Sequence, residues 1–135
     1  MARIVMKFGG TSVADLDRIR NVARFVRREV DDGHSVIVVV SAMAGQTNAL
    51  AELAAEAGLP AAALDARDVE YDAIVATGEQ VTSGLLALVM QNLGYRARSW
   101  QGWQIPMRTC SSHGKARILE IPEELLSAAI DNGEI

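Results

Sequence analysis

The fold of this chain is decided by residues 4–13, Ile4-Val5-Met6-Lys7-Phe8-Gly9-Gly10-Thr11-Ser12-Val13. Arg3 to Met6 are mainly apolar or β-branched, which is typical of a buried strand. Lys7-Phe8 close this strand. The pair Gly9-Gly10 then predicts a tight turn, because glycine has no Cβ and tolerates strained backbone.

This order of strand, lysine and glycine turn suits a phosphate group. Thr11-Ser12 offer helix N-caps, and Asp15 stands at capping-box distance from Ser12, so a helix should begin here. Glycine N–H groups, a helix N-terminus and the Lys7 ammonium would together attract an anion. The stretch alone leaves a plain turn with a solvated lysine equally open. It is neither a P-loop nor a G-x-G-x-x-G fingerprint.

The composition indicates one globular domain, since half of the 135 residues are apolar. Acidic residues outnumber basic ones by 17 to 13, a net charge of −4, which argues against a nucleic-acid or membrane-surface protein. We expect no membrane span and no signal peptide. Cys110 is the single cysteine, so an internal disulfide is impossible and a reducing cytoplasm is expected.

A second strand is predicted at Ser35–Val40, where the apolar run does not alternate with polar residues. Such a run suits a strand covered on both faces, as in a parallel sheet. Apolar residues recur at helical spacing between Leu16 and Val30, and Gly33 should end that helix. The first third of the chain is therefore predicted to be a right-handed βαβ unit.

The loop 41–48 follows the carboxyl end of the second strand, where ligands bind in open α/β sheets. Its alternative role is a plain connection in which Thr47 caps a helix that begins near Ala49. Gly84 should cost a helix about 1 kcal/mol, which a close backbone contact would explain. Further helices are predicted at 61–67, 68–76, 81–93 and 123–132, with an interruption at 77–80 and with Pro122 at the N1 position of the last helix. Strands are predicted at 95–100 and 116–121, and a loop is predicted at 101–113.

Four segments together resemble the signatures of aspartate kinases, members of the amino-acid kinase family. They occur in the family's order and spacing and cover almost the whole chain. Each segment alone is a modest signal. The segments are Lys7-Phe8-Gly9-Gly10-Thr11-Ser12, Val39-Val40-Ser41-Ala42-Met43-Ala44-Gly45, Thr77-Gly78-Glu79-Gln80-Val81-Thr82-Ser83, and Arg108-Thr109 with His113-Gly114-Lys115-Ala116-Arg117-Ile118.

The resemblance implies a three-layer α/β/α amino-acid kinase fold with a mainly parallel sheet. It implies transfer of the ATP γ-phosphoryl group to the β-carboxylate of L-aspartate, with Mg²⁺ accompanying the nucleotide. Family members continue well beyond residue 135, so we expect residues 1–135 to be the N-terminal portion of a truncated catalytic domain without its regulatory ACT domains. The complete protein would be a cytoplasmic homo-oligomer.

The resemblance also implies site roles. Lys7 would be catalytic, would neutralise charge on the transferring phosphoryl group, and would bind ATP together with Phe8, Gly9, Gly10 and Ser41. Thr47 and Glu79 would hold the amino acid, with Glu79 pairing with its α-ammonium group. Without the resemblance, the preferred role of Glu79 is favourable charge at a helix N-terminus, worth about 0.3–1 kcal/mol. No metal ligands are assigned.

Two functional hypotheses stay open. In the first, the chain is part of an aspartate kinase and its residues serve that reaction in the complete protein. In the second, it is a non-catalytic fragment that binds phosphate or a partner. Residues 1–135 alone are expected to be inactive and to associate or expose apolar surface. Cys110 and His113 are too few for a zinc site and lack an orienting group for nucleophilic catalysis.

Overall fold

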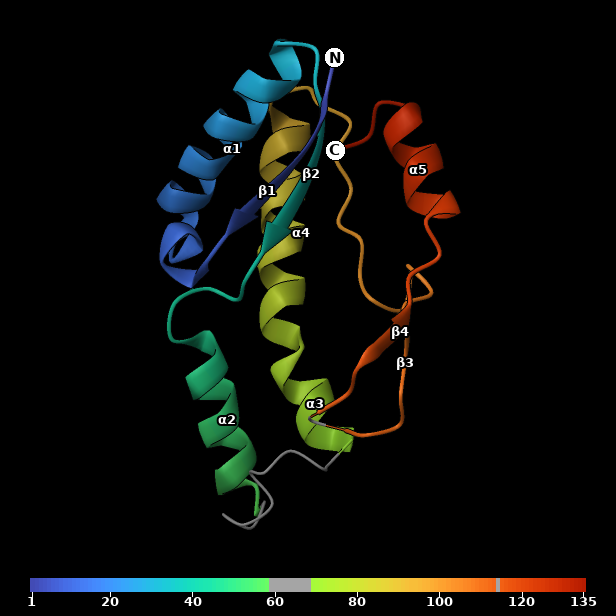
Figure 1. Ribbon diagram of the computed structural model, residues 1–135. Helices are drawn as coiled ribbons and strands as arrows, with labels where there is room; N and C mark the ends of the chain where they lie inside the picture. The colour runs from blue at the N-terminus through green and yellow to red at the C-terminus, as the bar shows by residue number, and fades with distance from the viewer. Residues whose placement is uncertain (59–68, 114) are drawn as a thin grey trace.

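A computed structural model describes residues 1–58, 69–113 and 115–135 (Figure 1). The helix expected at 61–67 lies outside these residues. The elements in chain order are β1 (Arg3–Phe8), the 3₁₀ turn η1 (Gly10–Val13), α1 (Leu16–Asp31), β2 (Ser35–Val40), α2 (Gln46–Glu56), α3 (Val69–Val75), α4 (Thr77–Asn92), β3 (Arg108–Thr109), β4 (Ile118–Glu120) and α5 (Glu124–Asp131).

The βαβ prediction is confirmed, because β1 and β2 pair in parallel with α1 between them in sequence. The register runs from Arg3 opposite Ser35 to Phe8 opposite Val40. The loops that leave both strands therefore start side by side. The second sheet, β3 with β4, is a short antiparallel pair.

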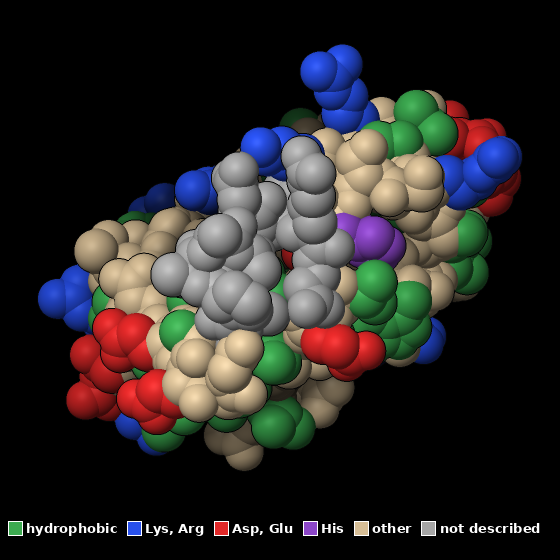
Figure 2. Space-filling model, turned by 90° about the horizontal axis from the view of Figure 1, so that it is seen from below, with side chains coloured by type: hydrophobic (Ala, Val, Ile, Leu, Met, Phe, Trp, Pro, Cys, Tyr) green, Lys and Arg blue, Asp and Glu red, His purple; other side chains and the backbone are tan. Residues whose placement is uncertain are grey.

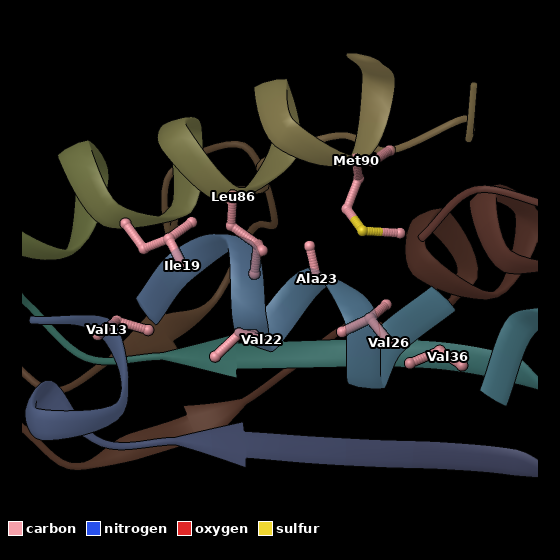
Figure 3. Close-up of a cluster of buried hydrophobic side chains, with 9 residues drawn as sticks. Val13, Ile19, Val22, Ala23, Val26, Val36, Leu86 and Met90 are labelled. Carbon is pink, nitrogen blue, oxygen red and sulfur yellow. The ribbon is translucent and has the colours of Figure 1, made fainter. Parts of the chain in front are cut away.

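The core lies between α1, α4 and one face of the parallel pair (Figure 3). Ile19 of α1 and Met90 of α4 are fully buried, and they pack with Val36 of β2. The opposite face is more open, since Val5 is 63% and Val39 46% exposed. The expectation of a strand covered on both faces is therefore wrong for the part of the chain that the structure describes.

The turn after β1 differs from its prediction. Gly10 begins a single 3₁₀ turn, and α1 starts six residues later, capped by Asp15, whose side chain accepts a hydrogen bond from the N–H of Arg18 (2.8 Å). Thr11 and Ser12 are not its N-caps. The reason is packing: the 3₁₀ turn places Val13 at 0% exposure in the core, and the helix can start only beyond it.

Other predicted helix starts also differ from those in the structure. Helix α2 begins at Gln46, after Gly45 in the left-handed conformation (φ 81°), so Thr47 lies in its first turn and is not the cap. Residues 77–80 do not interrupt a helix but form the first turn of α4. Pro122 stands before the N-cap of α5 and not at its N1 position. The helix ends at Gly33, Gly94 and Gly133 are confirmed, each with positive φ.

Residues 95–100 are extended but are not assigned as a strand. Among the described residues, their ladder-like backbone hydrogen bonds are with Ile135: Arg98 N–H donates to the Ile135 carbonyl (3.1 Å), and Ile135 N–H donates to the Arg96 carbonyl (2.9 Å). A strand needs a neighbour along its length, and among the described residues this segment has one only at a single position. The predicted loop at 101–113 contains the two residues of β3.

Helices α3 and α4 together span Val69–Asn92, which is long and apolar enough to cross a membrane by length and composition. This finding does not overturn the expectation of no membrane span. The core helix of a soluble protein meets the same criterion, so the evidence for a span is weak. Helix α4 contacts both α1 and β2.

Figure 2 shows from below the end of the molecule that carries α2 and α3, and this face carries charges of both signs. Acidic and basic side chains both lie around its rim, with hydrophobic side chains between them. The net negative charge of the chain is therefore not gathered into one acidic surface on this face.

Two glycines let three segments touch: the turn after β1, the loop after β2 and the first turn of α4. A Cβ on Gly10 would lie 3.0 Å from the Ala42 carbonyl oxygen, and a Cβ on Gly78 would lie 2.8 Å from the Ala42 Cβ. A Cβ on Gly84, in the same helix as Gly78, would meet nothing within 4 Å. The close contact expected at Gly84 is thus absent among the described residues, and it occurs at Gly78.

A polar bridge fixes the far end of α1. The Tyr95 hydroxyl donates to Asp31 Oδ1 (2.5 Å), and Arg27 Nε donates to Asp31 Oδ2 (3.2 Å). These two hydrogen bonds, with that of Tyr95 the larger cause, hold the pKa of Asp31 below its usual value. The bridge joins α1 to the segment that follows α4.

We expect Gly78→Ala and Gly84→Ala to have opposite effects on stability. Alanine at position 78 must push Ala42 away, at a cost of about 1–3 kcal/mol that exceeds its gain in helix propensity. Alanine at position 84 has space and should stabilise α4 by up to about 1 kcal/mol. Urea unfolding of both variants measures this, and equal effects would show that the Ala42 contact is not tight.

We expect Tyr95→Phe to destabilise the protein more at pH 7 than in acid. Because the pKa of folded Asp31 is lowered, its stabilisation is fully present above the unfolded pKa of about 3.9 and is lost as pH falls through the lower, folded pKa. Urea midpoints between pH 7 and pH 3 report the difference. Tyr71→Phe is the control, and a pH-independent effect of Tyr95→Phe would refute the linkage to Asp31.

Candidate phosphate and substrate site

Three segments meet around Ala42, which is 4% exposed. They are the glycine turn after β1, the loop after β2, and the first turn of α4. Gly10 approaches the Ala42 carbonyl and Gly78 approaches the Ala42 methyl group, as described above. Ser41 N–H donates to the Phe8 carbonyl (3.1 Å) and so extends the β1–β2 ladder by one bond toward this point.

Glu79 is tied to the same loop. Its Oε1 accepts a hydrogen bond from the Ala42 N–H (3.1 Å), which joins residues 37 apart in sequence. The carboxylate remains exposed, and its Oε2 has no hydrogen-bond partner within the described ranges. One oxygen therefore holds the loop while the other is available to a ligand.

The Lys7 ammonium group lies over the glycine turn. A Cβ on Gly9 would be 3.8 Å from Lys7 Nζ. Lys7 is exposed and has no ion pair with any residue that the structure describes. The N–H groups of Gly9, Gly10 and Thr11 likewise have no hydrogen-bond acceptor in those parts of the chain. Backbone donors and a positive charge thus stand together without a protein anion.

The arrangement departs from the sequence-based picture in one respect. The turn is followed by the short 3₁₀ turn η1, and the N-terminus of α1 begins only at Leu16. The attraction for an anion would come from Lys7 and the local N–H groups, and the dipole of a long helix is not directly behind them. Coulomb attraction by Lys7 is therefore the larger contribution.

The other predicted residues are placed less closely. Ser41 is half-buried directly after β2. Thr47 is exposed in the first turn of α2, and its hydroxyl makes no hydrogen bond to a described residue. The structure brings Lys7, Gly10, Ser41 and Glu79 to one end of the sheet, while no contact joins Thr47 to them. Sequence reasoning gave no role to Ala42 and Gly78, although both lie in segments that resemble the family signatures.

A cavity of ≈ 560 Å³ lies apart from the glycine turn. It lies along β2 and α4, with Glu79 among its lining residues and Lys7 absent from them. Ser83 and Gln101 add a polar pair in this cavity, since Gln101 Nε2 donates to Ser83 Oγ (3.0 Å). Glu79 is therefore the residue that the glycine-turn site and the cavity share.

No group of three or more His, Cys, Asp or Glu residues in the described ranges could hold a metal ion. Cys110 Sγ accepts a hydrogen bond from Arg117 N–H (3.2 Å), and backbone N–H groups, first that of Arg117, lower the pKa of this thiol. His113 instead pairs with Asp72 of α3 (3.3 Å). The two residues thus have separate partners.

Known proteins resemble this chain in sequence. The amino acid kinase family model matches residues 2–135. Aspartokinase 2 of Bacillus subtilis is 43% identical over 135 residues, which are 100% of this chain and 32% of that protein. The aspartokinase of Rickettsia conorii is 45% identical over 126 residues, or 93% and 31%. The chain thus spans about a third of the length of these curated relatives.

Solved structures show the same fold. The aspartate kinase from Synechocystis superposes with a TM-score of 0.74 at 33% identity, covering 97% of this chain and 20% of that one. E. coli aspartokinase III, solved in complex with aspartate and ADP, gives 0.76 at 24% identity, covering 99% and 39%. The predicted α/β fold class is confirmed. The family match over residues 2–135 shows that this chain belongs to the amino acid kinase family.

Proposed function

We propose that this chain forms the N-terminal portion of an aspartate kinase catalytic domain. The complete protein would transfer the ATP γ-phosphoryl group to the β-carboxylate of L-aspartate and give 4-phospho-L-aspartate, the first step toward lysine, threonine and methionine. One observation carries the proposal. Lys7, the N–H groups of Gly9 and Gly10, and Glu79 Oε2 have no hydrogen-bond or ion-pair partner among the described residues, and their segments meet at the loop around Ala42.

The two halves of this site suit the two substrates. Phosphoryl transfer depends mainly on positioning and on stabilising charge, and fixed donors are most effective where charge develops. Lys7 with the N–H groups of Gly9 and Gly10 would bind the transferring phosphate, and Phe8 and Ser41 would flank it. Mg²⁺ bound to the nucleotide would neutralise further phosphate charge.

Glu79 would bind the amino acid. The α-ammonium group of aspartate needs a carboxylate partner, and Glu79 Oε2 is available for it while Oε1 remains on the Ala42 N–H. A carboxylate held by a backbone donor is preoriented, so less entropy is lost when the ammonium group binds. Thr47 would complete this half of the site from the start of α2.

The proposal extends to the complete protein. It would be a homo-oligomer in the cytoplasm, consistent with the single cysteine. The alternative, a non-catalytic fragment that binds phosphate or a partner, uses the same Lys7 turn but gives no role to Glu79. Kinetics of the two residues in one enzyme therefore separate these proposals.

For the first test, residues 1–135 replace the matching third of Bacillus subtilis aspartokinase 2, which is 43% identical. Lys7→Ala in this chimera should lower kcat at least about 100-fold, because a preorganised charge of this kind is worth about 2.7–4 kcal/mol. Aspartate-dependent ADP release is the measurement, and circular dichroism checks the fold. Near-normal turnover would exclude Lys7 from catalysis.

Two controls accompany this test. Arg20→Ala removes a cation of α1 that is paired with Asp17 (2.7 Å) and should leave kcat unchanged. Residues 1–135 alone should release no aspartate-dependent ADP. Turnover by this part alone would show that the remaining two thirds are dispensable, against the proposal of a partial catalytic domain.

Glu79→Gln in the same chimera should raise KM for aspartate far more than KM for ATP. Glutamine keeps an oxygen for the Ala42 N–H and loses only the charge, and the loss of a hydrogen-bonded charge partner typically costs about 2–5 kcal/mol. Glu79→Ala removes the loop hydrogen bond as well and should also lower stability. If Glu79→Gln changed both KM values equally, the role of Glu79 would be structural.

A further inference from the structure

The glycine turn after β1 is held by few hydrogen bonds of its own. The N–H groups of Gly9, Gly10 and Thr11 have no acceptor among the described residues. Ser12 N–H donates to the Gly9 carbonyl (2.9 Å) and closes the 3₁₀ turn η1. Glycine loses more conformational freedom on folding than other residues, so two adjacent glycines are costly to order. A contact from outside the turn therefore has a large effect on how well its donors are aligned.

Arg18 provides such a contact from the first turn of α1. Its Nη1 donates to the Thr11 carbonyl (3.0 Å), which lies seven residues earlier in the sequence. The Arg18 N–H donates to Asp15 Oδ1 (2.8 Å), and Arg18 Nε lies 3.7 Å from Asp15 Oδ2. The N-cap residue of α1 therefore also orients the guanidinium group. The next residue, Ile19, is 0% exposed in the core, so the helix that carries Arg18 has a fixed position.

Two peptide groups connect Arg18 to the glycine turn in series. Arg18 donates to the carbonyl of the peptide group between Thr11 and Ser12. The N–H of that peptide group donates to the carbonyl of the peptide group between Gly9 and Gly10. A trans peptide group places its C=O and its N–H on opposite sides. The series that begins at the Arg18 guanidinium therefore ends at the free Gly10 N–H.

This series changes the electrostatics of the turn. Hydrogen bonds in series polarise one another, by about 10–30% per bond in condensed-phase estimates. A cationic donor makes the first bond charge-assisted and so strengthens it further. The Gly10 N–H thereby gains positive character as a donor. The dipole of α1 does not lie directly behind this turn, because the helix begins only at Leu16. The charge of Arg18 takes the place of that dipole.

We propose that Arg18 is a positioning residue of the phosphate site. It fixes the Thr11 carbonyl and, through the two peptide groups, strengthens the Gly10 N–H as a donor to a phosphate oxygen. Arg18 does not touch the phosphate itself, because its guanidinium group is directed to Thr11 and Asp15. This inference rests on the proposed function, in which Lys7 and the N–H groups of this turn bind the transferring phosphate.

The alternative role of Arg18 is a surface ion pair that only stabilises α1. Its distance to Asp15 is long and both side chains are 60% exposed, and ion pairs of this kind contribute little to stability. Arg20 on the same helix has this alternative role. It pairs with Asp17 (2.7 Å) and makes no hydrogen bond to the backbone of any residue that the structure describes. Arg20 is therefore the matched control for Arg18.

The test uses the chimera with Bacillus subtilis aspartokinase 2 and three substitutions of Arg18. Arg18→Met removes the charge and the donor, Arg18→Gln keeps a neutral donor, and Arg18→Lys keeps both. Arg20→Met is the control. Aspartate-dependent ADP release gives kcat and the KM values for both substrates. Urea unfolding followed by circular dichroism gives the stability of each variant.

We expect Arg18→Met to lower kcat about 10-fold, because the hydrogen bond that is lost is charge-assisted. KM for aspartate should change less than about twofold, because Arg18 is not connected to Glu79. Arg18→Lys should restore kcat to within about threefold, since it keeps a cationic donor. Arg18→Gln should lie between the two, and Arg20→Met should match the parent chimera.

Several results would overturn the proposal. They are a loss of stability in Arg18→Met without a loss of kcat, equal losses of kcat in Arg18→Met and Arg18→Lys, and an equal rise of both KM values. If Arg18→Met does not fold, Arg18→Gln and Arg18→Lys are compared instead, and equal kcat values in these two would contradict the role of the charge.

Lys7→Ala in the same chimera separates this inference from the proposed function. If Lys7→Ala lowers kcat and Arg18→Met does not, the phosphate site stands and the role assigned to Arg18 is wrong. If Lys7→Ala leaves turnover near normal, the phosphate site itself is wrong and this inference falls with it.

Discussion

The site depends on one steric constraint, the close approach of Gly10 and Gly78 to Ala42. Either glycine with a side chain would push the loop after β2 outward, since neither contact leaves room for a Cβ. The parallel register already places the ends of β1 and β2 side by side, at Phe8 and Val40. The two glycines add the start of α4 to that corner, so three separate parts of the sequence share one small volume.

This constraint has an electrostatic consequence. Because α4 lies against the loop, Glu79 reaches the Ala42 N–H and is held there with its charge exposed. Lys7 lies over the glycine turn, which contacts the same loop, and it has no counter-ion among the described residues. The two charges therefore belong to segments that both touch Ala42, and no ion pair joins them.

Local chemistry predicted the βαβ unit and several helix ends well. Glycines with positive φ end helices for reasons contained in a few residues, as at Gly33 and Gly94. The start of α1 could not be predicted in the same way. Ser12 had the right spacing for a capping box, yet Val13 had to enter the core first, and Asp15 became the cap. Tertiary packing outweighed a local signal worth about 1 kcal/mol.

The candidate site also combines features that local chemistry predicts with features that only the tertiary fold determines. The sequence pointed to Lys7, the glycine turn and Glu79, because lysine, glycine and glutamate have a clear chemistry. It did not point to Ala42, because a small apolar residue has no chemical signal of its own and matters only through what touches it. A close contact would have explained Gly84, yet the close contact occurs at Gly78. Which glycine of a helix meets a neighbour depends on the rotation of that helix in the fold.

The Ala42 corner depends more on helix packing than on the sheet. The core of α1, α4 and β2 is built within the described residues, and it is enough to fix this corner. The sheet contributes the parallel register of β1 and β2, which starts the two loops side by side. Helix α4 is far from both strands in sequence, yet it supplies the Gly78 contact and the Glu79 hydrogen bond to Ala42. The geometry of the corner is therefore a property of the tertiary fold and not of any one segment.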